Sequence, residues 1–182
     1  MALTLARFLD PGNIYLQVDL LGRDAITSAL SRGLEARGIV KETFAAAAIA
    51  REAEMPTGLL LADGLNVAVP HTDPEHVVRT GLAVATLAKP VLFGSMDDPE
   101  TMLPVRVVVV MALSERKAQI EMLQAIVDLF QDGKVLRELI AARSEEEVFA
   151  LLGGLRCELI EARTQLSEPN RPTIGSSTAQ TC

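Results

Sequence analysis

Aromatic residues are scarce in this sequence: of its 182 residues only 3% are Phe, Trp or Tyr, with no Trp and a single Tyr at position 15. A hydrophobic core must therefore be built from aliphatic side chains. Those are plentiful, since 49% of the residues are hydrophobic and 23% are charged. Such a balance excludes a disordered or fibrous chain, and the length suits one domain with or without a tail.

Cysteine is scarce as well, because only Cys157 and Cys182 are present. Two cysteines make a poor disulfide framework, so we expect a protein of the reducing cytoplasm. The N-terminus lacks the basic start and long apolar stretch of a secretory signal. The most apolar runs, 44–50 and 107–113, are too short for a membrane-spanning helix, which needs roughly 20 residues.

Positive charge is also in deficit. Lys and Arg total 17 against 24 Asp and Glu, which gives a formal charge of −7. Nucleic acid requires clustered positive charge, so the sequence argues against a nucleic-acid partner. It also lacks a Gly-rich phosphate loop and a Gly-x-Ser-x-Gly elbow, so neither nucleotide binding nor serine hydrolysis is indicated.

Helical patterns flank a strand-rich middle. Possible cap residues, Asp24 and Ser114, mark the starts of two helices. We expect helices over about 24–38, 42–55, 114–131, 134–142, 145–152 and 155–165, and strands over about 66–69, 81–87 and 105–112. The run at 107–111 is apolar on both faces, which is typical of a central strand covered by helices on both sides. The sequence therefore predicts an α/β sandwich around a mixed β-sheet.

The ordered pattern extends from about residue 14 to about residue 165. Residues 167–182 are rich in Ser, Thr and Pro and show no apolar period, so we expect a flexible C-terminal tail there. The predicted organisation is one domain over 1–166 followed by this tail.

The only two histidines, His71 and His76, follow the strand at 66–69 in the segment Val-Pro-His-Thr-Asp-Pro-Glu-His. A histidine on a proline-stiffened loop at a strand end is well placed for chemistry. Three interpretations stay open. His71 could be a structural loop residue, or it could bind metal with Asp73 and His76. Its neutral imidazole could instead carry a phosphoryl group, which needs no metal or nucleotide cofactor when the donor is a phosphoprotein.

Three stretches carry a resemblance to a known family: Arg51-Glu52, then Pro56-Thr57-Gly58-Leu59, then Asn66-Val67-Ala68-Val69-Pro70-His71-Thr72. Together they resemble the signature of enzyme IIA domains of the fructose/mannitol class, from the bacterial sugar phosphotransferase system. The resemblance covers about residues 14–152. The form Pro-His-Thr-Asp-Pro-Glu-His is most similar to the galactitol-type branch.

The resemblance implies an α/β sandwich and a role as phosphocarrier. Family members accept a phosphoryl group on histidine from HPr and pass it to a cysteine of a cognate enzyme IIB, which links them to the membrane enzyme IIC. His71 matches the phosphorylated histidine and Arg51 the assisting arginine; the alternative for Arg51 is a structural, snorkelling side chain. Relatives of this fold also act as regulatory modules whose phosphorylation state controls partner binding, and that function remains the alternative for the chain.

One position departs from the mannitol-type pattern. Those members place a second histidine near the active one, and the corresponding position here is Gln119. An amide can donate to a phosphoryl oxygen but cannot become an imidazolium. We therefore expect Arg51, Gln119, Thr72 and backbone N–H groups to stabilise the phosphoryl group.

Overall fold

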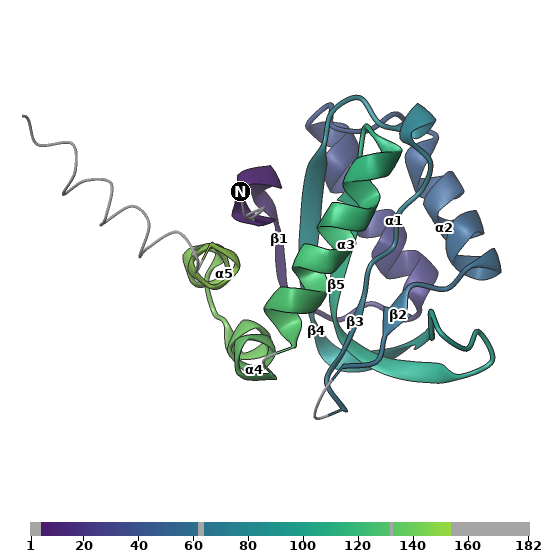
Figure 1. Ribbon diagram of the computed structural model, residues 1–182. Helices are drawn as coiled ribbons and strands as arrows, with labels where there is room; N and C mark the ends of the chain where they lie inside the picture. Colours follow the sequence, from purple (N-terminus) through teal and green to yellow (C-terminus); the bar gives the residue numbers. More distant parts are fainter. Residues whose placement is uncertain (1–4, 62–63, 132, 154–182) are drawn as a thin grey trace, which may run out of the picture.

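A computed structural model describes residues 5–61, 64–131 and 133–153 (Figure 1). The helix expected over 155–165, the tail expected over 167–182 and both cysteines lie outside these residues. The described part of the chain begins with a short 3-10 helix, η1 (Leu5–Phe8), and another, η3 (Pro74–His76), follows the segment that carries the first histidine.

Five strands form one mixed sheet in the order β1-β4-β5-β3-β2. Their bounds are β1 (Leu9–Val18), β2 (Gly58–Leu59), β3 (Asn66–Ala68), β4 (Gly81–Gly94) and β5 (Met102–Ala112). β1 runs parallel to β4, and β3 runs parallel to β5, whereas β4–β5 and β2–β3 are antiparallel pairs. The predicted α/β class and mixed sheet are confirmed.

Among the residues of 5–153 that the structure describes, the helices that cover the sheet are α1 (Arg23–Ala36), α2 (Phe44–Glu54), α3 (Arg116–Phe130), α4 (Gly133–Ala141) and α5 (Glu145–Leu152). In Figure 1, α3 crosses in front of the sheet, whereas α1 and α2 lie behind it. Within the described ranges, each helix is too short or too polar to cross a bilayer.

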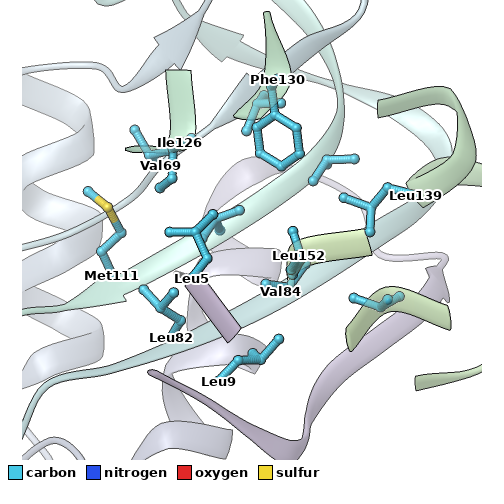
Figure 2. Packing of buried hydrophobic residues seen from close by; sticks show 14 of the residues in the cluster. Leu5, Leu9, Val69, Leu82, Val84, Met111, Ile126, Phe130, Leu139 and Leu152 are labelled. Atoms are coloured by element: carbon cyan, nitrogen blue, oxygen red, sulfur yellow. The ribbon is translucent and has the colours of Figure 1, made fainter. Parts of the chain in front are cut away.

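The central strand β5 explains the two cores. Its residues alternate between faces, as the strand period requires. Val107, Val109 and Met111 join a cluster with Ile126 and Phe130 of α3, which Figure 2 shows together with side chains from the strands and from η1, α4 and α5. The intervening residues of β5 join a second cluster with α1 and α2. The apolar run therefore lies where the sequence predicted it, in the middle of the sheet.

The sequence-based strand boundaries need correction in two places. The ordered chain starts earlier than residue 14, because Leu5 and Leu9 are buried in the core and β1 starts at Leu9. The Pro-Gly pair in β1 hides this strand from pattern analysis. The strand predicted to end at Leu87 continues through Pro90 to Gly94. A register shift between Thr86 and Val91 accommodates the proline, which has no N–H for the ladder.

Both predicted helix caps are wrong. Asp24 lies inside the first turn of α1, and the N-cap residue is Gly22, which has a positive φ of 88°. Ser114 pairs its hydroxyl with that of Thr80 at 2.9 Å, and Glu115 is the N-cap of α3. Neither helix start has a side-chain cap hydrogen bond.

Gly33 provides a stability test of the contact between α1 and β1. A Cβ added there would lie 1.9 Å from the hydroxyl oxygen of Tyr15. We expect Gly33→Ala to lower the free energy of unfolding by about 1–3 kcal/mol because of this overlap. Adding Tyr15→Phe should recover most of the loss, since the next ring atom is 3.1 Å away. Urea unfolding of both variants measures this, and equal stability of the single variant and wild type would refute the close contact.

Candidate functional site

The end of β3 presents His71 beside the end of β5. After Ala68 the chain stays extended, and Met111 donates its backbone N–H to the carbonyl of Pro70 at 2.9 Å. An isolated parallel bridge then joins His71 itself to Met111. Because β5 is anchored on both faces, the histidine stands on a rigid support, although it lies outside any regular element.

The ring of His71 is held through Nδ1. This nitrogen lies 2.8 Å from the carbonyl oxygen of Val69. A carbonyl can only accept, so Nδ1 must carry the proton, and Nε2 of the neutral ring then has a free lone pair. Burial lowers the pKa of His71 below its ordinary value of 6.5, and the positive charge of Arg51 lowers that pKa further, while the bond to Val69 and the charge of Asp73 oppose the shift.

Arg51 lies in the last turn of α2 and is half-buried. It flanks the face that buries Phe44, Ala48 and Glu52. Its guanidinium donates to the thioether sulfur of Met55 at 2.6 Å, and no carboxylate pairs with it among the described residues. Since a thioether is a weak acceptor, most of the donor capacity of Arg51 is available for an anion.

His71, Arg51 and Gln119 line one cavity of about 380 Å³. The rest of its wall is mostly apolar, contributed by Glu54, Met55, Pro56, Thr57, Met96, Pro99, Met111, Ile120 and Leu123. Its polar groups are the guanidinium of Arg51, the imidazole of His71, the amide of Gln119, the carboxylate of Glu54 and the hydroxyl of Thr57. The guanidinium and the amide can donate hydrogen bonds to an anion at this wall. Three of the four predicted site residues are therefore brought together.

Gln119, in the first turn of α3, contacts Thr72. The half-buried Gln119 donates its Nε2–H to the backbone carbonyl of Thr72 at 3.3 Å, which ties the segment after His71 to α3. The second N–H of this amide has no partner in the described part of the chain. Thr72 is only 5% exposed and is not among the residues that line the cavity. Its predicted contact with a phosphoryl group therefore stays a prediction.

The second histidine lies apart from this cavity. His76 pairs its Nδ1 with the hydroxyl of Thr43 at 2.8 Å and its Nε2 with Glu75 at 3.3 Å. Asp73 instead faces Arg116 at 3.6 Å. Across residues 5–61, 64–131 and 133–153, no group of three or more His, Cys, Asp or Glu side chains converges as metal ligands. The alternative in which His71, Asp73 and His76 bind one metal therefore has no geometric support.

Glu52 and Thr57 belong to the stretches that carry the family resemblance, but no role was predicted for either residue. Glu52 is 1% exposed and accepts hydrogen bonds from the backbone N–H of Thr57 at 3.1 Å and from its hydroxyl at 2.6 Å. Burial raises the pKa of Glu52, and the two bonds from Thr57 oppose the shift. The only signal in the sequence was a carboxylate one residue after Arg51, on the same side of α2 as Phe44 and Ala48.

The lowered pKa of His71 predicts a pH dependence. Nε2 is a nucleophile only in the neutral ring, so reactivity at this nitrogen should persist below pH 6.5 and fall only at the lowered pKa. Between that pKa and 6.5 the unfolded chain binds more protons than the folded one, so the free energy of unfolding should rise with pH in this window. Titration of the ring by NMR measures the pKa of His71, on which both expectations rest. A midpoint at or above 6.5 would contradict the burial argument.

Most of the chain is similar to known proteins of one family. The model of a family described as "Phosphoenolpyruvate-dependent sugar phosphotransferase system, EIIA 2" matches residues 7–153. The galactitol-specific EIIA component of Escherichia coli (strain K12) is 25% identical over 123 residues, which cover 68% of this chain and 81% of that protein. The ascorbate-specific EIIA component of Shigella boydii is 38% identical over 95 residues, 51% of this chain and 58% of that protein.

Solved structures show the same fold. One example is the mannitol enzyme IIA of Escherichia coli in its complex with phosphorylated enzyme IIB. It superposes with a TM-score of 0.65 at 24% identity, over 80% of this chain and 96% of that one.

Proposed function

Since this chain belongs to the EIIA 2 family of the phosphoenolpyruvate-dependent sugar phosphotransferase system, we propose that His71 is its phosphoryl carrier. In the proposed reaction Nε2 of His71 accepts the group from phosphohistidine of HPr and passes it to a cysteine of a cognate enzyme IIB. The observation that carries this proposal is the hydrogen bond between Nδ1 and the Val69 carbonyl, which leaves Nε2 unprotonated on a ring that lines the same cavity as the side chain of Arg51.

Each transfer is an in-line displacement at phosphorus. In the first, a bond forms between Nε2 of His71 and phosphorus while the bond between phosphorus and the HPr nitrogen breaks, and its electron pair returns to the HPr ring. In the second, the cysteine thiolate of enzyme IIB forms the new bond and Nε2 of His71 regains its lone pair. Such transfers depend mainly on positioning and on stabilisation of charge, not on a cofactor.

Arg51 and Gln119 supply the stabilisation in this proposal. The guanidinium of Arg51 offers a planar set of donors that suits phosphoryl oxygens, and its charge is not neutralised by a carboxylate in the described structure. The amide of Gln119 adds a neutral donor from α3. The positive charge of Arg51 and the burial of His71 both keep the ring neutral and therefore nucleophilic.

The rim of the cavity suits a protein partner. Two of its residues are apolar and exposed, Ile120 at 75% and Met55 at 56%. The formal charge of −7 suits partners with a basic contact patch, which would speed encounter at low salt. A partnership with enzyme IIB is supported by the mannitol complex, in which a similar chain binds phosphorylated enzyme IIB.

The direct test is incubation with enzyme I, HPr and labelled phosphoenolpyruvate, followed by mapping of the label and addition of a galactitol-type enzyme IIB. We expect one label on His71, dependent on HPr, and its transfer to a cysteine of enzyme IIB. Label at another residue would overturn the assignment of His71. Stable labelling without transfer to any enzyme IIB would favour the regulatory alternative.

A further inference from the structure

Glu52 is a buried acidic group that the proposed transfer does not use. Its side chain is almost inaccessible, and no cation pairs with it within the described ranges. Both of its oxygens are instead used by one residue, Thr57, through the backbone N–H and the hydroxyl. Burial raises the pKa of Glu52, while the hydrogen bonds from Thr57 and the charge of Arg23 oppose the shift. A buried carboxylate is costly unless it is hydrogen-bonded, so its two bonds to Thr57 indicate that it fixes the segment after α2.

Thr57 connects this carboxylate to the reactive ring. The carbonyl of Thr57 accepts the backbone N–H of Val69 at 3.2 Å. This bond continues the antiparallel pairing of β2 with β3, in which Gly58 faces Ala68. The carbonyl of the same Val69 then accepts the Nδ1–H of His71 at 2.8 Å. The carboxylate of Glu52, the residue Thr57 and the backbone of Val69, through its N–H and its carbonyl, therefore link α2 to the ring of His71.

From this chain of bonds we infer that Glu52 is a positioning residue, which holds the Thr57–Val69 pairing so that the Val69 carbonyl selects the tautomer of His71 with a free Nε2. The inference rests on the proposed function of His71. Glu52 also follows Arg51 directly in α2, so the same anchor fixes the helix end that carries the guanidinium against the strand end that carries the ring.

The chemical consequence lies in the tautomer. A neutral imidazole can carry its proton on either nitrogen, and the partner of Nδ1 decides which form dominates. If the Val69 carbonyl moves away, part of the population places the proton on Nε2, where it blocks attack on phosphorus. Transfer then slows although His71 and Arg51 are both intact. A displacement of about 1 Å at such a position costs up to about 100-fold in rate.

The test compares Glu52→Met with Glu52→Gln. Methionine matches the length of the side chain but cannot accept the N–H of Thr57, whereas glutamine can accept this bond and donate to the hydroxyl. We expect Glu52→Met to slow phosphoryl transfer about 10-fold, and nitrogen NMR shifts of His71 to show a new population protonated at Nε2. Glu52→Gln should restore both the rate and the tautomer of wild type.

Leu30→Ala is the matched control, because Leu30 of α1 is fully buried in the core that α1 shares with α2 but takes no part in the bonds that link Glu52 to His71. It should lower Tm but leave the tautomer of His71 unchanged. Thr57→Val, which removes only the hydroxyl bond, carries the test if Glu52→Met does not fold, and should shift the tautomer in the same direction. A wild-type tautomer in the folded Glu52 or Thr57 variants would overturn the inference. Because this NMR readout needs no phosphoryl donor, it is independent of any failure of the proposed function.

Discussion

His71→Gln is expected to abolish phosphoryl acceptance from phospho-HPr completely while the protein stays folded. Glutamine is similar in size and can still donate to the Val69 carbonyl, but it has no nucleophilic nitrogen. The free energy of unfolding should change by less than about 1 kcal/mol, since the side chain is only half-buried. Labelling with phosphoenolpyruvate, enzyme I and HPr measures the acceptance, and thermal unfolding measures the fold.

His76→Gln is the control for this experiment, because it removes the other histidine, which lies outside the cavity and pairs with Thr43 and Glu75. It should be labelled like wild type. If His71→Gln retained the label and His76→Gln lost it, the carrier would be His76 and the assignment of His71 would be refuted.

Arg51→Ala is expected to slow transfer by about 100-fold without abolishing it. Loss of one preorganised donor to a developing charge typically costs this much. The same variant should raise the pKa of His71 toward its ordinary value, because the charge of Arg51 is one of the causes that lower it. Single-turnover transfer from phospho-HPr and NMR titration of the ring measure the two effects on one sample.

Two further variants sharpen the test of Arg51. Arg51→Lys keeps the charge but loses the planar set of donors, so its rate should fall between wild type and Arg51→Ala. Arg143→Ala removes an equal charge from an exposed site outside the cavity, and it should transfer at the wild-type rate. Equal rates for Arg51→Ala and Arg143→Ala would make Arg51 a structural residue.

The parts of the fold that followed from the sequence are those with strong periodicity. The valine run of β5 and the helix α3 were both predicted, because burial on fixed faces imposes regular apolar patterns, and Met122, Ile126 and Phe130 of α3 are indeed buried in the core. β1 was missed because its Pro-Gly pair and its irregular register interrupt the alternation. The caps were wrong because Gly22 and Glu115 start their helices without a side-chain cap hydrogen bond.

At the site, the sequence was a better guide to which residues belong to it than to the contacts that these residues make. The sequence indicated His71, Arg51 and Gln119, but their meeting in one cavity depends on tertiary packing that no local pattern encodes. The acceptor at Nδ1 of His71, the carbonyl of Val69, could be identified only from the structure. The positioning role of Glu52 was not predicted, because a charged residue in a helix is normally solvent-exposed, and only the structure shows that Glu52 is buried.

The walls of the cavity come from opposite sides of the sheet, since α2 packs in one core and α3 in the other. The guanidinium of Arg51 and the amide of Gln119 therefore come from different helices on different faces of the sheet, and they stay close only while both helices are packed on it. A transient detachment of α3 would separate them while the strands remained paired. In the proposed function, the ability to hold a phosphoryl group therefore depends on the packing of both helix layers against the sheet, and local unfolding of α3 would remove it below the temperature of global unfolding.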